Sequence, residues 1–286
     1  MMRTRIFNKM TAREVEDYLA RGGNTIYVGV GVVELHGASP IDVEQIGPEA
    51  YAVAMAEATD GLAMINLPYF FPGGTIVSPA TVQVSVRESI DYLMMISRSL
   101  VAQGFRKIFY ISGHGPARLY IDAMCRDFFQ ESKIHVCHLN SMAFGRNFAE
   151  KTADGKPDFS RLAFMSAGAY KILHQEQYLP VDPEAKDPEY SFGAPMDPRM
   201  QELSDSLKPF GGSVSMYYSN DNQHGAGRPY RSVEERDEAC RKGEAMIREE
   251  VERMVPALER LKNAIDTYHG YVQELIQEKP RFGGLY

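Results

Sequence analysis

The chain has 286 residues, which is long enough to bury a substantial hydrophobic core and to form one large α/β domain or two small ones. Hydrophobic residues make up 44% of the chain and charged residues 24%, a balance that argues against disordered and fibrous proteins. The net charge of -7 argues against a nucleic-acid-binding protein, because phosphate recognition requires a surplus of Lys and Arg.

Predicted helices and strands alternate along the first half of the chain. The helices are predicted at residues 11–20, 47–59, 86–103 and 117–130. The strands are predicted at residues 25–33, 61–70, 105–115 and 133–141. Thr11 and Glu14 form a capping box, Pro48 suits a first helical turn, and Gly104 ends a helix. The alternation predicts a three-layer α/β/α sandwich with a mostly parallel sheet.

The pattern weakens in the second half of the chain. Helices are predicted at residues 162–173 and 233–261, and a strand at 213–220. Residues 180–209 hold many prolines and charges and are predicted to form an irregular loop, a lid over a site or a subunit contact. Because there is no internal repeat and no linker-like tract, residues 1–286 are expected to form a single domain.

The cysteines and the lengths of the apolar segments indicate where in the cell the protein is expected. Cys125, Cys137 and Cys240 are widely spaced and odd in number, as in a reducing compartment, and they indicate neither a disulfide nor a metal site. The apolar runs fall short of the roughly 20 residues of a membrane span, and the charged N-terminal segment has no apolar signal-peptide core. We expect a cytoplasmic protein that acts on a small molecule and binds neither membrane nor nucleic acid.

Candidate metal ligands follow two of the predicted strands. Ligands bind parallel α/β sheets beyond the carboxyl ends of the strands. Glu34, His36 and Asp42 follow the first strand, and His114 follows the third within a Gly-His-Gly turn. Glu34 and His36 project to the same side, because they are two residues apart in an extended segment. Such carboxylates and imidazoles suit a divalent cation of the zinc or manganese type, which activates water for hydrolysis.

The residues taken alone leave other interpretations open. A Glu-x-His segment after a strand can cap a helix or contact solvent, and Asp42 can stabilise the turn before Gly47. The turn around His114 can instead cradle a phosphate with backbone N–H groups. A nucleotide-binding protein is the weaker alternative, because the chain has no G-x-G-x-x-G or Walker-type loop.

Four motifs in order resemble those of the creatininase (creatinine amidohydrolase) family. They are Glu34-Leu35-His36-Gly37, Asp42, Phe71-Pro72-Gly73-Gly74-Thr75 and Ser112-Gly113-His114-Gly115. The resemblance spans about residues 25–141, with a fainter similarity in RPYRSVEERDEACRKGE near the C-terminus. It implies a creatininase-like α/β sandwich, commonly assembled as a homo-oligomeric hexamer.

The resemblance also implies a ligand set and a reaction. Glu34 and His114 would ligate one divalent metal (Zn, Mn or Fe), His36 would ligate a second, and Asp42 would bridge both. Family members attack small amides, including cyclic ones, with metal-activated water, and relatives are deformylases or act on a cyclic inosose. We therefore expect a metal-dependent hydrolase of a small cyclic or amide-like substrate.

Departures from the family pattern leave the number of metals at one or two per subunit. The family's second metal takes a glutamate either two residues after the turn histidine or in a later segment. Here those places hold Pro116 and Ala169. Ligation by Glu44 or Glu176 could compensate, although a solvated helix charge is the preferred interpretation of both, and His224 lies in a glycine-flanked turn. We carry Glu176 and His224 forward as the candidate catalytic residues.

Two further hypotheses stay open. The first is a hydrolase that opens a cyclic polyol ketone such as an inosose in carbohydrate catabolism. The second is a non-catalytic relative that keeps the scaffold with a degraded metal site and binds a ligand or partner.

Overall fold

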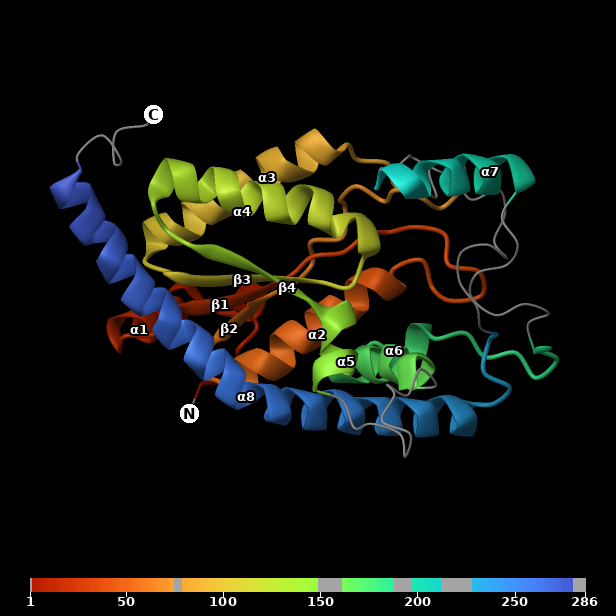
Figure 1. Cartoon of the computed structure of the whole chain (residues 1–286). Coiled ribbons are helices and arrows are strands. Elements are labelled where there is room, and N and C mark those ends of the chain that lie inside the picture. Colours follow the sequence, from red (N-terminus) through yellow and green to blue (C-terminus); the bar gives the residue numbers. More distant parts are fainter. Residues whose placement is uncertain (1, 75–78, 149–160, 188–196, 212–227, 280–286) are drawn as a thin grey trace.

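A four-stranded parallel sheet forms the centre of the molecule (Figure 1). The structure is a computed structural model that describes residues 2–74, 79–148, 161–187, 197–211 and 228–279. The strands are β1 (Thr25–Gly29), β2 (Leu62–Met64), β3 (Lys107–Ser112) and β4 (Val136–Asn140). Their order is β2-β1-β3-β4, and every pairing is parallel. The predicted parallel sheet is therefore confirmed.

Helices cover both faces of the sheet (Figure 1). On one face lie α1 (Ala12–Ala20), α3 (Val86–Gln103) and α4 (Arg118–Ser132). On the other lie α2 (Val43–Ala58), α5 (Phe144–Asn147), α6 (Arg161–Ile172) and α8 (Val233–Glu278). Neighbouring strand residues such as Ile108 and Phe109 pack into the hydrophobic clusters on opposite faces of the sheet, because successive side chains of a strand point to opposite faces. This is the predicted three-layer α/β/α arrangement.

Short 3-10 helices and one further helix complete the described elements. The 3-10 helices are η1 (Phe7–Lys9), η2 (Gly115–Ala117), η3 (Ser141–Ala143), η4 (Glu176–Tyr178) and η5 (Lys208–Phe210). The further helix is α7 (Pro198–Leu207), capped by the Asp197 side chain. None of the helices in the described ranges has a stretch long and apolar enough to cross a membrane.

The helix ends that depend on local sequence signals agree best with the predictions. Thr11 and Glu14 form the expected capping box of α1. Helix α3 has the predicted bounds, and Gly104 ends it with a φ of 114°, a conformation that glycine adopts without steric cost. Each of these signals acts within one helical turn, so tertiary packing does not alter it.

Helix α2 corrects the sequence prediction where it matters for function. It begins at Val43 rather than Gly47, so Pro48 lies inside the helix and Glu44 lies in its first turn. A proline in the second turn removes one helical N–H, and the helix tolerates this loss here because it packs against the sheet. Strand β1 is also shorter than predicted and ends at Gly29.

Other predictions were also wrong in part, and strand β2 ends at Met64 although the strand was predicted to continue to residue 70. Residues 198–207 form α7, so the segment 180–209 is not irregular throughout, because Asp197 and Pro198 supply an N-cap and a first helical residue. Helix α8 continues to Glu278, past the predicted end at residue 261, and the buried Ile265 and Val272 extend its apolar face. The predicted strand at 213–220 lies outside the described residues.

A glycine just after the end of β1, Gly31, lets α2 approach the sheet closely. A Cβ atom added at Gly31 would lie 2.5 Å from the Gln45 Cα and 2.5 Å from the Glu44 carbonyl oxygen. Real Cβ atoms do not make such contacts, so any larger residue at this position would displace the helix. The close approach brings the first turn of α2 beside the loop that carries Glu34.

Candidate metal centre

The loop after β1 holds Glu34 and His36 at the carboxyl edge of the sheet. The Glu34 N–H donates to the Ile41 carbonyl at 2.9 Å, which closes the loop on itself. The Leu35 N–H donates to Thr81 Oγ1 at 3.2 Å. These bonds fix the backbone on both sides of the two candidate ligands without using their side chains.

His114 reaches the same edge from the neighbouring strand. Strands β1 and β3 pair in parallel, with Gly29 opposite Ile111, so the segments that follow them leave the sheet side by side. The His114 N–H donates to Ser112 Oγ at 3.2 Å, which ties the histidine to the end of β3. Ser112 stands where the family motif has asparagine, and its hydroxyl holds the turn.

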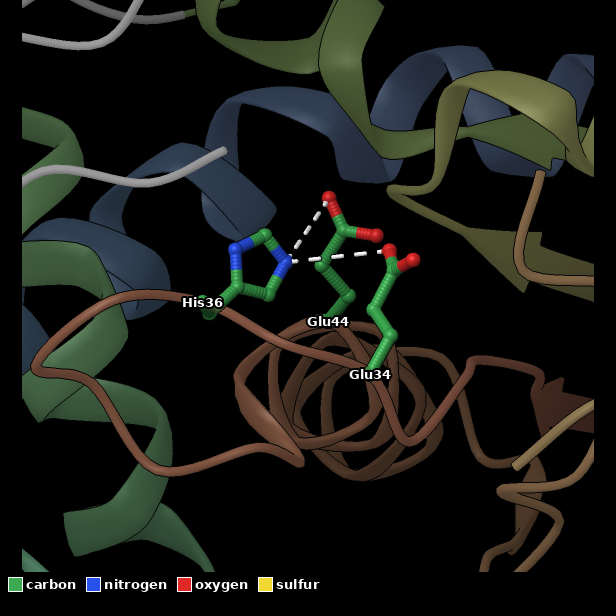
Figure 2. Close-up of side chains that lie close together, drawn as sticks. All are labelled: Glu34, His36 and Glu44. Atoms are coloured by element: carbon green, nitrogen blue, oxygen red, sulfur yellow. Dashed lines mark ion pairs between the residues drawn. The ribbon is translucent and has the colours of Figure 1, made fainter. Parts of the chain in front are cut away.

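Two carboxylates and two imidazoles converge here. His36 Nε2 lies 3.8 Å from Glu34 Oε1 and 3.5 Å from Glu44 Oε1. His114 Nε2 lies 3.2 Å from Glu34 Oε1 and 3.5 Å from Glu44 Oε2. Figure 2 shows the His36 ring aimed at both carboxylates, with Glu44 rising from α2 and Glu34 from the adjacent loop. Glu44 thus offers one oxygen to each imidazole.

The spacing of these atoms fits a small divalent cation. A tetrahedral ion with bonds of about 2.0 to 2.2 Å holds its ligand atoms about 3.3 to 3.6 Å apart. The four carboxylate-to-imidazole distances run from 3.2 to 3.8 Å. Glu34, His36 and Glu44 form the group in the described part of the chain whose ligand atoms all lie within 4.8 Å of one another, whereas His114 approaches the two carboxylates but is not in that group. Histidine and carboxylate donors suit zinc or manganese.

Because the cluster is buried, its two carboxylates are energetically unfavourable in their charged form unless a cation is bound. The side chains of Glu34, His114 and His36 are 0%, 3% and 8% exposed, and Glu44 is 22% exposed. Burial, and then the negative charge of Glu34, raise the pKa of Glu44 well above its usual range. Glu44 Oε2 and His114 Nδ1 are buried with no hydrogen-bond partner among the described residues. A cation between the carboxylates would remove their repulsion and give Glu44 Oε2 a partner.

The structure brings together three of the four predicted ligands. Glu34, His36 and His114 meet as expected, whereas Asp42 is not among the residues whose ligand atoms converge. Its carboxylate instead accepts a hydrogen bond from the buried Tyr170 hydroxyl of α6. Glu44 takes the position expected of Asp42, so its interpretation as a solvated helix charge was wrong. Asp42 directly precedes α2, and aspartate is a favoured N-cap residue, so this signal could have placed Glu44 in the first turn.

Of the two candidate catalytic residues, the structure describes Glu176 alone. Glu176 belongs to η4 and pairs with Lys171 Nζ at 2.6 Å. The hydrogen bond from Lys171 holds the pKa of Glu176 below its usual range, which makes this carboxylate a weak proton acceptor. His224 lies outside the described residues.

Comparisons with known proteins identify one family. A family model for creatininase, described as creatinine amidohydrolase, matches residues 8–178. A solved structure named "Creatininase Mn" is 18% identical with a TM-score of 0.59, and the match covers 90% of this chain and 98% of that one. A creatininase variant complexed with creatine (18% identity, TM-score 0.60) and a Zn-Zn type variant (18% identity, TM-score 0.58) show the same two coverages. A search of curated proteins finds no match.

The fold similarity extends over most of the chain, even though the identity is low. The family match covers more than half of the chain and includes the loops that carry the four converging side chains. The chain therefore belongs to the creatininase family, a family of metal-dependent hydrolases.

Proposed function

We propose that the protein hydrolyses a small cyclic or amide-like substrate with one divalent cation bound by Glu34, His36, Glu44 and His114. The observation that carries the proposal is the convergence of two carboxylates and two imidazoles at 3.2 to 3.8 Å. A bound cation would supply Lewis acidity, which activates water and polarises the substrate carbonyl.

The ligand set supports one cation rather than two. Asp42, the expected bridging residue, is engaged by Tyr170. Glu34, His36 and Glu44 form the one group of three or more candidate ligands in the described part of the chain whose ligand atoms lie within 4.8 Å of one another.

The charge of the centre supports a neutral substrate. Two ionised carboxylates balance one divalent cation, and the two imidazoles ligate in their neutral form. Such a centre has no surplus positive charge for a phosphate ester, whereas an uncharged amide or ring carbonyl meets no repulsion. The creatine of one solved creatininase complex is a zwitterion whose net charge is also zero.

His224 remains the candidate for proton transfer to the leaving group. Histidine is the side chain type whose unperturbed pKa best suits proton transfer near neutral pH. Replacement of His224 by Gln is expected to lower kcat and leave the metal content unchanged. Loss of metal in this variant would instead make His224 a ligand.

Metal analysis tests the proposal first. The purified protein is expected to contain about one equivalent of Zn, Mn or Fe, and His114→Ala is expected to remove it. His269→Ala, which alters a histidine of α8, is the matched control and should keep the metal. A metal-free protein that is insensitive to chelators would refute the metal centre.

A substrate screen then separates the functional alternatives. The metal-loaded protein is tested on cyclic amides, formamides and cyclic polyol ketones. Hydrolysis of an amide that stops on chelation supports the proposal, and selective opening of a cyclic ketone supports the inosose-type alternative. Stoichiometric metal without hydrolysis of any of the three classes would favour a ligand-binding scaffold.

A further inference from the structure

Tyr120 differs from the other deeply buried tyrosines of the described residues. Its ring is 0% exposed, yet its hydroxyl has no hydrogen-bond partner there. By contrast, the Tyr27 hydroxyl bonds Thr59 Oγ1 at 2.7 Å and the Tyr110 hydroxyl bonds Ser97 Oγ at 2.7 Å. A buried hydroxyl without a partner is destabilising, so such groups are uncommon in folded proteins.

The position of Tyr120 places this hydroxyl near the metal centre. The residue lies in the first turn of α4, six residues after His114. Its ring stacks on the fully buried Phe70, with ring centroids 5.5 Å apart and planes 5° apart, which fixes the direction of the hydroxyl. After burial itself, the negative charges of Glu44 and then Glu34 raise the pKa of Tyr120. The hydroxyl therefore lies within electrostatic reach of both carboxylates.

We propose that Tyr120 is a positioning residue whose hydroxyl donates a hydrogen bond to the Glu34–Glu44 carboxylate pair when a cation is bound. This inference rests on the metal centre proposed above. A carboxylate that ligates a metal through one oxygen leaves lone pairs on the other, and an outer donor usually satisfies them. Tyr120 is suited to this role because its ring is already immobilised and its hydroxyl is not engaged within the described structure.

The hydroxyl would act in two ways. It would hold the carboxylates in the orientation that meets the cation, and it would share the negative charge that they carry. Removal of an outer-shell partner typically weakens metal binding by about 10- to 100-fold. In the metal-free protein the same hydroxyl stabilises nothing, so its removal should not lower stability.

Tyr120→Phe tests the inference, because it deletes the hydroxyl and keeps the stacked ring. Tyr110→Phe is the matched control on the same face of the sheet, since its hydroxyl is bonded to Ser97. For each protein, the Tm of the chelator-treated form is measured by calorimetry, and the Kd for Zn²⁺ and Mn²⁺ by competition titration.

The expected results have opposite patterns in the two variants. Tyr120→Phe should weaken metal binding by about 10- to 100-fold and leave the metal-free Tm equal or higher. Tyr110→Phe should lower the metal-free Tm and leave the Kd unchanged. An unchanged Kd in Tyr120→Phe, or a fall in its metal-free Tm like that of Tyr110→Phe, would overturn the role of Tyr120. If the wild-type chain binds neither metal, the metal centre itself is refuted, and the role of Tyr120 with it.

Discussion

Replacement of Glu44 by Gln distinguishes the ligand set of the structure from the one expected from sequence. The change keeps the size of the side chain and removes its charge. Glu34 and Glu44 ligand atoms lie within 4.8 Å of one another. At an effective dielectric constant of about 20, two ionised carboxylates at that distance repel by about 3.5 kcal/mol.

This repulsion gives Glu44→Gln two effects of opposite sign. At a pH where Glu44 of the wild-type chain is ionised, the metal-free variant should be more stable than the wild-type chain by about 3 kcal/mol, because Glu34 then has no charged neighbour at this position. Metal binding should weaken by more than the about 10- to 100-fold that loss of an outer-shell partner costs. The Tm of the chelator-treated protein and the Kd for Zn²⁺ measure the two effects separately.

Asp42→Asn is the matched control for this experiment. The amide oxygen can still accept the hydrogen bond from Tyr170, so the variant should lose only about 1 kcal/mol, the difference between a charged and a neutral acceptor. Its metal content should equal that of the wild-type chain. Loss of metal from Asp42→Asn together with retention by Glu44→Gln would refute the assignment of Glu44 and restore the sequence-based ligand.

Three other variants or conditions give independent tests. Because the pKa of Glu44 is raised in the folded state, its protonation stabilises the metal-free protein at low pH, and this contribution is lost as the pH rises from the ordinary glutamate pKa through the raised one. Over that rise the metal-free Tm should fall and the Tm gain on adding metal should grow, whereas a pH-independent gain would argue against proton release from the site. Gly31→Ala should lower both stability and metal content, because its Cβ would lie 2.5 Å from the Gln45 Cα of α2. A Cβ at Gly47, which lies within α2, has no neighbour within 4 Å, so Gly47→Ala should keep the metal. Equal behaviour of the two variants in thermal melts and metal analysis would contradict the close-approach argument. Glu176→Gln should keep the metal and kcat, because this carboxylate is already paired with a lysine, and a large fall in kcat would return it to the catalytic residues.

Much of the architecture is encoded over short distances along the chain. The capping box at Thr11 and the glycine stop at Gly104 set helix ends within a single turn. Apolar segments that alternate with helices implied a parallel sheet, and β1 and β3 do lie side by side. Because both strands end at the same edge, Glu34 and His114 could be placed together before any coordinates were considered.

What the sequence could not supply is the depth to which one element packs on another. Glu44 becomes a candidate ligand because α2 starts four residues earlier than Gly47 and Gly31 allows the helix to approach the sheet. The sequence pattern favoured Asp42, whose carboxylate is taken by Tyr170, a residue 128 positions away in the chain. Contacts of that separation leave no periodic signal.

The sequence by itself therefore determined the parallel α/β fold, the family motifs and the edge of the sheet where ligands would gather. Only the tertiary structure decided which carboxylate faces the two histidines and which buried hydroxyl has no hydrogen-bond partner among the described residues. The physical reason is that motif spacing specifies where a side chain leaves the backbone, whereas ligation depends on distances of 3 to 4 Å between atoms of separate elements.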